Sequence, residues 1–400
     1  MGLLDRRPSL RGCAIALAAI AGIACAANAH AAVTVSDDSL ALTLGAQLQT
    51  RVQRATALDA LGQDHDAVLG RPGRSDGADF SLRRFRLSLT GSYHAVYKFA
   101  LVSATDGVDS AGYQTSRQTQ AYKAWIARDF YTGDLTHTLH TGLDHAFFNR
   151  SVASEASHLF PQQRATAALM PVRGVGARYK LTGDHVDLGV DVMNGLDTGK
   201  PTANADRSDG LFYSARLELA LLEGTKPEYR ESYAGASGEG LILAVDVGYD
   251  HANHVTPLQK TSSLGYGVEA LAHQDGLSAL IDLRWLSIRG ASTVGAGDVS
   301  SRQHVYLMQI GYAVPLDAGV AIEPAIRYSI LEFDTPGDEV YDTTANPDSE
   351  WGGSGRQVDA GLNVYFNKHA NKLQLSYARW DAESGDARAH IIRLQHQFYF

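Results

Sequence analysis

Three features of the sequence predict an all-β fold, a transmembrane antiparallel β-barrel of about sixteen strands. Segments that alternate apolar and polar residues recur along most of the chain, as a strand with one apolar face requires. Short turns between these segments alternate with long polar loops, which is the pattern of outer-membrane barrels. The chain also ends in an amphipathic segment whose last residue is aromatic, and such a strand can close a barrel by pairing with the first one.

The closing strand is expected over the last ten residues, 391–400. Ile392, Leu394, His396 and Phe398 fall on one face, and the intervening polar residues fall on the other. These residues alone also fit an edge strand of a soluble β-sandwich. A soluble sandwich, however, gives no reason for short and long connections to alternate, so the rest of the chain favours the barrel.

The N-terminal segment 1–31 is predicted to be a cleavable secretory signal peptide. Three arginines precede an apolar run over 13–27, and Ala29-His30-Ala31 then provides a small-residue cleavage site. The run is too short for a membrane-spanning helix. Residues 32–400 are therefore expected to form the barrel, in a bacterial outer membrane.

Both cysteines, Cys13 and Cys25, lie in this removable segment, so no disulfide or cysteine-based metal site is expected in the mature chain. A lipoprotein signal acylated at Cys25 is a weaker alternative, because Gly22 stands where leucine is usual. Removing three Arg and one Asp from 35 basic and 44 acidic residues leaves 32 and 43, a net charge of −11. This balance argues against a nucleic-acid partner.

The alternation predicts strands along the whole mature chain. Expected strand segments are 40–53, 84–90, 97–101, 122–126, 135–144, 175–182, 186–192, 211–221, 241–250, 264–272, 277–288, 304–314, 320–331, 358–366, 373–380 and 390–400. Short turns are expected at Gly91-Ser92, Gly183-Asp184 and Leu316-Asp317. Long polar loops are expected at 55–80, 105–118, 195–209, 290–301 and 334–355.

Aromatic residues near the expected strand ends are typical of the belts that sit at the two membrane surfaces. They are Tyr93, Tyr97, Phe130, Tyr131, Tyr312, Tyr328, Tyr365, Phe366, Tyr377 and Trp380. The ordinary preference of tyrosine for strands is the alternative explanation.

The polar face would line the lumen, which is wide enough for water in a barrel of this size. Its expected cations are Arg51, Arg84, Arg86, Lys98, Lys123, Arg128, Arg178 and Lys180. Its expected acids are Asp144, Asp187, Asp191, Asp246, Glu269 and Asp282.

Segment 145–170 breaks the alternation and is the candidate for an inward-folded constriction loop. Arg150, Arg164 and Arg173 would lie near the narrowest point, where their charged planar groups suit phosphate or carboxylate oxygens. These arginines could instead pair with Asp144, Glu155 and neighbouring acids and only stabilise the loop. The sequence leaves both readings open.

Signals for catalysis or metal binding are weak, and neither an enzyme nor a cofactor is expected. The sequence has no G-x-S-x-G, H-E-x-x-H or P-loop motif. The pairs His137/His140 and His251/His254 do not predict a specific metal site, since the first pair splits between the two faces of its strand.

Several segments resemble the phosphate-selective porin O/P family. They are 83–91 followed by 97–99, 121–126 leading to 141–143, Pro171-Val-Arg-Gly-Val-Gly176, and the last three strands, 361–367, 373–377 and 393–400. Their order and spacing cover most of the mature chain. The resemblance implies a sixteen-stranded, trimeric outer-membrane channel for small anions, with phosphate or polyphosphate as the favoured solute.

By position, the resemblance makes seven residues candidates for contact with the anion: Arg84, Arg86, Lys98, Lys123, Arg150, Arg164 and Arg173. The chain departs from the family in its negative net charge and in lacking a dense, regular basic ladder. A general porin of the same fold, whose lumen acids neutralise the arginines, therefore stays open as an alternative. A barrel-borne enzyme or adhesin that acts through its long loops is the rival from another class.

Overall fold

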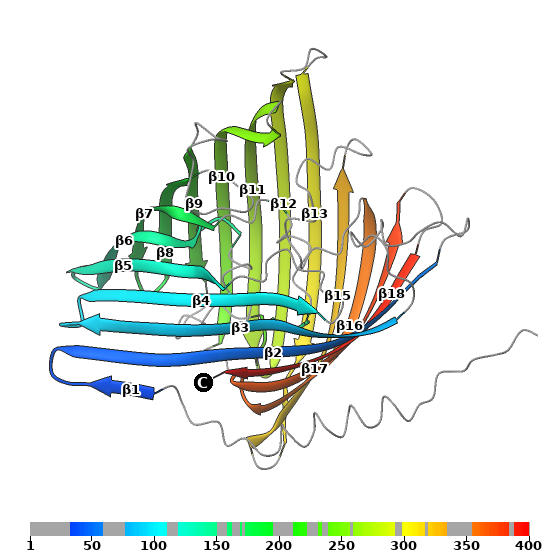
Figure 1. Cartoon of the computed structure of the whole chain (residues 1–400), viewed down its shortest axis with the longest axis horizontal. Coiled ribbons are helices and arrows are strands. Elements are labelled where there is room, and N and C mark those ends of the chain that lie inside the picture. The colour runs from blue at the N-terminus through cyan, green and yellow to red at the C-terminus, as the bar shows by residue number, and fades with distance from the viewer. Residues whose placement is uncertain are drawn as a thin grey trace, which may run out of the picture.

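The computed structural model places strands around a single closed wall (Figure 1). It describes residues 33–58, 77–109, 119–149, 158–161, 169, 173–194, 211–221, 231–233, 239–256, 259–292, 298–316, 319–333, 354–383 and 388–399. The predicted signal peptide, residues 1–31, lies outside the described residues. Within the described ranges, no helical segment has the length and apolarity that a membrane-spanning helix requires.

Sixteen long strands form the wall, which confirms the predicted fold class. They are β2 (Leu40–Leu58), β3 (Gly77–Tyr93), β4 (Tyr97–Asp109), β5 (Gln120–Thr132), β6 (Leu135–His145), β7 (Arg173–Thr182), β8 (Val186–Asn194), β9 (Leu211–Ala220), β10 (Gly240–Thr256), β11 (Gln259–Gln274), β12 (Leu277–Ser292), β13 (Asp298–Tyr312), β15 (Ala321–Phe333), β16 (Gly355–Asn367), β17 (Asn371–Ala382) and β18 (Arg388–Tyr399). Two short strands, β1 (Val33–Ser36) and β14 (Val314–Pro315), pair with β2 and β15. Consecutive long strands pair antiparallel.

The last strand closes the wall by pairing with the first long one. β18 lies antiparallel to β2, with a register that runs from Arg388↔Leu58 to Tyr399↔Gln47. Ile392 is exposed on the outside while Arg393 and Gln395 are buried inside, as the alternation predicts. Closure leaves no long strand with an unpaired edge, which a structure in lipid cannot tolerate.

The alternation of outward apolar and inward polar residues is sharpest in β10 and β11. Val245, Val247 and Val268 are 50%, 42% and 46% exposed. Asp246, between the two β10 valines, is 5% exposed, and Glu269, which follows Val268 in β11, is 2% exposed. Exposed apolar side chains on a wall of this kind face lipid, and the buried charges face the lumen. The hydrophobic surface is therefore on the outside of the protein.

The connections differ between the two ends of the barrel. Connections of two or three residues, at 94–96, 133–134, 183–185, 275–276 and 368–370, join strands at one end. Long connections, such as 59–76, 110–119 and 334–354, lie at the other end, although β10 and β11 extend there as a hairpin with only 257–258 between them. By this inequality the short-turn end is periplasmic and the long-loop end is extracellular.

Two connections at the short-turn end differ from the prediction, and one agrees with it. The turn at Gly183-Asp184 is confirmed, but the one at Gly91-Ser92 is wrong because both residues lie within β3. That strand turns instead at His94 and Ala95, which adopt positive φ values of 50° and 57°. The connection 221–239 is long although it joins β9 to β10 at the short-turn end, and the sequence did not predict this.

Most of the predicted aromatic belt faces outward near strand ends. Tyr93, Tyr97, Tyr131, Tyr312 and Tyr377 are 42–61% exposed. Tyr365 and Trp380 are corrections, because they are only 1% and 4% exposed and face the interior. An aromatic residue near a strand end can therefore lie on either the outer or the inner face of the wall.

A lipid-facing position at the middle of β17 tests this orientation. Leu375 is 48% exposed and lies between Leu362 and Leu394 on the neighbouring strands. We expect Leu375→Arg to lower the free energy of unfolding by roughly 2–4 kcal/mol, because a charge near the bilayer midplane is costly. Urea unfolding in phosphatidylcholine vesicles measures this change, with Leu375→Met as the control. An arginine variant as stable as the methionine variant would contradict the assignment of this face.

Candidate functional site

Charge is divided between two halves of the inner wall. The half formed by β2–β8 and β18 carries ten described cationic side chains against four carboxylates. The cations are Arg51, Arg83, Arg84, Arg86, Lys98, Lys123, Arg173, Arg178, Lys180 and Arg393, and the acids are Asp129, Asp144, Asp187 and Asp191. We call this the basic half.

The half formed by β9–β17 has the opposite balance, with seven described wall carboxylates against four cations. The acids are Glu218, Asp246, Asp250, Glu269, Asp282, Glu323 and Asp359, and the cations are Arg216, Arg284, Arg327 and Lys372. We call this the acidic half. Because the two halves face each other across one lumen, an ion inside experiences a field directed across the barrel.

The central feature of the basic half is an aromatic ring that two arginines contact. Arg86 lies with its guanidinium carbon 3.7 Å from the ring centroid of Tyr122, and Arg173 lies 4.8 Å from the same centroid. The Tyr122 hydroxyl lies 3.1 Å from Nε2 of His145. Tyr122 occupies the extra position of a β-bulge in β5, because Val102 pairs with Lys123 and Ser103 with Ala121. The bulge turns the ring inward beside Lys123.

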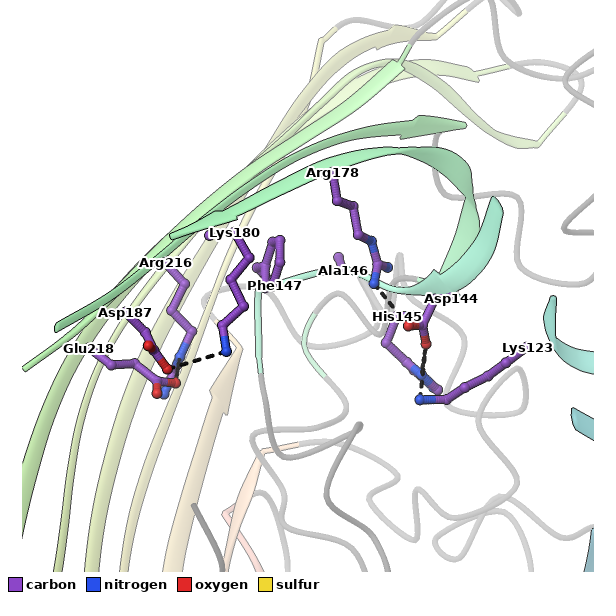
Figure 2. A pocket seen from close by; sticks show the side chains of 11 residues that line it. Lys123, Asp144, His145, Ala146, Phe147, Arg178, Lys180, Asp187, Arg216 and Glu218 are labelled. Carbon is purple, nitrogen blue, oxygen red and sulfur yellow. Dashed lines mark hydrogen bonds and ion pairs between the residues drawn. The ribbon is translucent and has the colours of Figure 1, made fainter. Parts of the chain in front are cut away.

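A cavity of about 190 Å³ adjoins this group. Figure 2 shows Lys123 and Arg178 directed at Asp144, and Lys180 directed at Asp187. Lys123 Nζ lies 3.0 Å and Arg178 Nη1 3.1 Å from Asp144 oxygens, and Lys180 Nζ lies 3.3 Å from Asp187. Four of its lining side chains are Lys or Arg and three are acids, so the cavity combines excess positive charge with internal ion pairs.

The acidic half, which contributes Arg216 and Glu218 to this cavity, holds two arginines within a set of carboxylates. Arg216 contacts Glu218, Asp246 and Glu269, and the donors of Arg284 contact Asp246, Glu269 and Asp282 at 2.8–3.6 Å. All six side chains are at most 3% exposed. Removing one partner of such a set leaves an uncompensated buried charge, so we infer that these arginines hold the wall together.

The candidate constriction segment folds into the barrel wherever it is described. Phe147 N donates to Asp191 Oδ2 at 2.7 Å, while Leu159 and Phe160 are each 1% exposed. The carbonyl of His158 accepts from Lys372 Nζ at 3.0 Å, and the carbonyl of Pro161 accepts from Arg51 Nη2 at 2.6 Å. Two wall cations are thus occupied in holding this segment.

Inward-facing glycines make room for the side chains of this segment. A Cβ atom at Gly189 would lie 2.6 Å from the Phe147 ring, and one at Gly361 would lie 2.9 Å from the Phe160 ring. A Cβ atom at Gly248 or Gly311 would lie 3.1 Å from Phe148 or 3.2 Å from Leu159, and closer still to the wall residues Phe212 and Ser278. The wall is therefore shaped to receive the loop, and larger inward side chains at these positions would displace it.

An apolar cluster lies inside the barrel toward the extracellular end, where the sequence predicted a polar lining. Phe148 and Leu169 of the loop pack there against inward-facing wall residues. The buried members are Ala146, Phe148, Leu169, Met193, Phe212, Leu286, Ile288, Val305, Leu331, Ala378, Trp380, Ala389 and Ile391. The cluster fixes the loop by hydrophobic burial rather than by charge.

A second segment enters the lumen from the periplasmic end, and the sequence analysis missed it. Residues 231–233, from the connection between β9 and β10, are anchored on Glu323 of β15. Glu323 accepts from Ser232 Oγ at 2.5 Å, Tyr365 OH at 2.6 Å, Tyr233 N at 3.2 Å and Ser278 Oγ at 3.2 Å. The length of this connection was the only sequence signal, because its polar residues resemble an ordinary loop.

The two inward segments contact each other. Leu159 N donates to Glu231 Oε2 at 3.3 Å, and His158 Nε2 lies 3.5 Å from Glu231 Oε1. Gln309 of the wall also donates to Glu231, at 3.2 Å. Segments from opposite ends of the barrel therefore meet at one level inside it.

Five of the seven predicted anion-contacting residues are described. Arg86, Lys123 and Arg173 gather around Tyr122 and the adjoining cavity. Arg84 is apart from them, donating to Gln49 Oε1 at 2.9 Å, and Lys98 pairs with Asp129 at 2.5 Å near a periplasmic turn. Arg150 and Arg164 lie outside the described residues.

Arg128 was expected in the lumen, and this expectation is wrong. Its side chain is exposed on the outer face, 5.3 Å from the Tyr97 centroid and 4.6 Å from the Phe130 centroid. The bulge at Tyr122 does not account for this, since Arg128 simply shares the parity of the outward Ile126. Its charge sits in the periplasmic aromatic belt, where a snorkelling arginine is tolerated.

Outside the membrane-spanning strands, Tyr233 also engages Glu239. The Tyr233 hydroxyl donates to Glu239 Oε1 at 2.5 Å and the Asp275 amide donates at 3.1 Å, and both lower the pKa of Glu239. Because the pKa of Glu239 is lowered, the stabilisation from this contact is fully present at pH values above 4.5. It is lost as the pH falls through the pKa of Glu239 in the folded protein.

The first prediction from the site concerns Glu323. Glu323→Ala leaves three buried donors and one half-buried donor without this acceptor, so we expect the free energy of unfolding to fall by about 1–3 kcal/mol. Hydrogen exchange at the Tyr233 amide should accelerate as well. Glu332→Ala, at an outward position of the same strand, is the matched control. Unchanged exchange at Tyr233 would show that Glu323 does not anchor the segment.

The second prediction concerns Glu239 and its pH dependence. We expect a carboxyl-carbon NMR titration to place the Glu239 midpoint below 4.5, and Tyr233→Phe to raise it toward that value. The physical reason is that the hydroxyl stabilises the carboxylate form. A midpoint that is the same in both proteins would refute the contact.

The sequence model of the family described as phosphate-selective porin O and P matches residues 62–239, which confirms the resemblance seen in the sequence. No curated protein matches the sequence.

Three solved outer-membrane structures are similar in fold. An anion-selective porin from Comamonas acidovorans has 8% identity and a TM-score of 0.56, with 90% of this chain and 100% of that chain covered. The outer membrane channel DcaP of Acinetobacter baumannii has 15% identity and a TM-score of 0.54, covering 93% and 100%. OmpT of Vibrio cholerae in a trimer form has 10% identity and a TM-score of 0.53, covering 91% and 100%.

At these identities the solved structures show the fold, and the family match comes from the sequence. The barrel has its apolar face outside and its charged face inside, as in an outer-membrane channel. The chain therefore has the fold of an outer-membrane β-barrel, and its residues 62–239 match the phosphate-selective porin O and P family.

Proposed function

We propose that this porin passes small anions passively, with phosphate or polyphosphate as the leading solute, and that it is not an enzyme. The observation that carries the proposal is the excess of cations in the basic half, centred on Arg86, Tyr122 and Arg173. An anion in the lumen is attracted to that half and repelled by the acidic half, so its path follows one wall.

The group around Tyr122 suits a step at which the anion loses part of its hydration shell. Arg86 and Arg173 lie over the Tyr122 ring, which orients their forked donors. Lys123 adds an ammonium group beside them, which lies 3.0 Å from Asp144 on a side chain that is 27% exposed. Guanidinium groups bind phosphate oxygens through paired hydrogen bonds, which supports phosphate over chloride as the solute held longest.

A general porin of the same fold is the second candidate, and one specific observation favours it. Asp144 lies within 3.1 Å of both Lys123 and Arg178, so part of the basic half is already neutralised. The third reading, an enzyme or adhesin acting through long loops, would require an acid–base cluster.

We propose in addition that the barrel is a homotrimer surrounded by outer-membrane lipid. The apolar outer wall supports the lipid contact, and the trimer form of the OmpT structure supports the assembly. Sedimentation of the protein in detergent gives the number of chains directly. Residues 1–31 are proposed to be removed on export, which the N-terminal sequence of the mature protein tests.

Planar-bilayer recording of the refolded mature protein tests the channel itself. Reversal potentials in a KCl gradient give the ion selectivity, and a phosphate titration at fixed chloride gives the block constant. Anion-selective reversal with saturable phosphate block supports the proposal. Cation-selective or unblocked current would favour the general porin, and the absence of conductance would favour the third reading.

Charge variants at the Tyr122 group give opposite predicted shifts. We expect Arg173→Gln to weaken phosphate block about threefold, because one unit charge roughly 6 Å from an ion in water is worth about 0.7 kcal/mol. Asp144→Asn should strengthen block by a similar factor, since it frees Lys123 and Arg178. Arg128→Gln, which removes an outward-facing charge, is the control. Equal block constants in all four proteins would overturn the assignment of the site.

A further inference from the structure

A group of arginines lies on the outer face of β16, β17 and β18, where the conducting lumen does not reach. Arg356, Arg379 and Arg388 are exposed, and Asp381 and His390 lie among them. We call these five residues the outer arginine patch. Its members have the same parity as the lipid-facing residues of their strands, which makes charged side chains unexpected there.

The strand register brings the patch together in two neighbouring rows. Arg356 is directly opposite Asp381, and Asp381 is directly opposite Arg388. One step toward the periplasm, Arg379 is directly opposite His390. Directly opposed residues in an antiparallel sheet have Cβ atoms roughly 5 Å apart, so three cations share an area of a few side chains.

The positive charge of the patch exceeds its negative charge. Asp381 is the acid that the cations share, with Arg379 Nη2 at 2.9 Å and Arg388 Nε at 3.3 Å. The side chains of Arg379 and Arg388 are 44% and 56% exposed, and that of Asp381 is 37% exposed. Arg356 pairs with no acidic side chain among the described residues, so three cations face one carboxylate.

The patch lies just beyond the extracellular aromatic belt. Tyr377 precedes Arg379 by two residues on the outer face of β17, and its hydroxyl lies 2.7 Å from Nδ1 of His390. Outward Tyr328 of β15 and Trp285 of β12 continue the belt. Aromatic belts mark the boundary between acyl chains and headgroups, so the guanidinium groups reach the headgroup level of the outer leaflet.

The short-turn rim carries charges of both signs. Asp134, Asp184, Glu239 and Asp275 are exposed in or beside its turns, and Lys368 and Arg128 are exposed there as well. The register of β16, β17 and β18, by contrast, brings three exposed arginines together at the extracellular end.

We propose that the outer arginine patch binds the phosphate groups of an anionic, phosphorylated glycolipid in the outer leaflet. Arg356 and the outward edges of Arg379 and Arg388 supply planar donors for phosphate oxygens, and Tyr377 supports the adjoining acyl chains. This binding is independent of anion conduction, since the patch lies on the outside of the wall.

The test compares lipid binding by the full mature barrel and two variants in detergent. Arg356→Gln/Arg379→Gln/Arg388→Gln removes the patch, and Arg128→Gln removes an outward arginine at the other rim. The probe is purified lipid A with two phosphate groups, beside the same lipid A after dephosphorylation. Native mass spectrometry gives the bound fraction at each lipid concentration, and far-ultraviolet circular dichroism confirms that each barrel is folded.

We expect the unmodified protein and Arg128→Gln to bind the phosphorylated lipid at least tenfold more tightly than the triple variant. We also expect the dephosphorylated lipid to bind all three proteins at the weak level of the triple variant. The proposal would be overturned if the triple variant bound the phosphorylated lipid as tightly as the unmodified protein does. It would also be overturned if the unmodified protein bound both lipids with equal affinity. A triple variant that loses self-association while lipid binding is unchanged would overturn it as well, and would assign the patch to a contact between copies.

Discussion

Backbone pairing in lipid is the constraint on which the rest of this structure depends. A peptide group left unpaired in the hydrocarbon region costs several kcal/mol, so a sheet that spans the membrane must close on itself. The pairing of β18 with β2 achieves this closure. Closure then gives every strand an inner and an outer face, so that each sequence position serves either lipid or lumen. The segregation of apolar and charged residues follows from this single requirement.

The inner face carries both the charge asymmetry and the contacts that hold the inward segments. Some wall cations are committed to structure: Arg51 and Lys372 donate to loop carbonyls, and Arg216 is surrounded by acids. Arg86 and Arg173 instead lie against the ring of Tyr122, and Lys123 beside them lines the cavity. A simple count of lumen arginines therefore overstates the charge that a solute meets. The charge that a solute meets depends on which arginines are paired with acids, because the field of a paired charge is largely cancelled a few ångströms away.

The inward segments show how a wide barrel is narrowed without any change to its wall pairing. One segment comes from the β6–β7 connection and the other from the β9–β10 connection, and they meet at Glu231. Glycines such as Gly189 and Gly361 leave space at the wall, and buried donors fix the backbone. Two kinds of contact hold the segments: aromatic rings pack on wall glycines, and loop carbonyls accept hydrogen bonds from wall cations. Both kinds act only over short distances. The position of the segments thus depends on close fit, and the wall would remain closed without them.

The sequence by itself determined the fold class, the strand count, the closing strand and the faces of most strands. This was possible because period-two alternation is a local property that lipid makes obligatory, and Ile392, Arg393 and Val245 obey it. Only the tertiary structure decided that Tyr122 sits in a bulge and contacts Arg86 and Arg173, that Arg128 faces outward, and that residues 231–233 anchor on Glu323. These features join residues that are distant in the chain, such as Ser232 and Glu323, and their contacts arise from barrel closure. Local periodicity carries no information about such contacts.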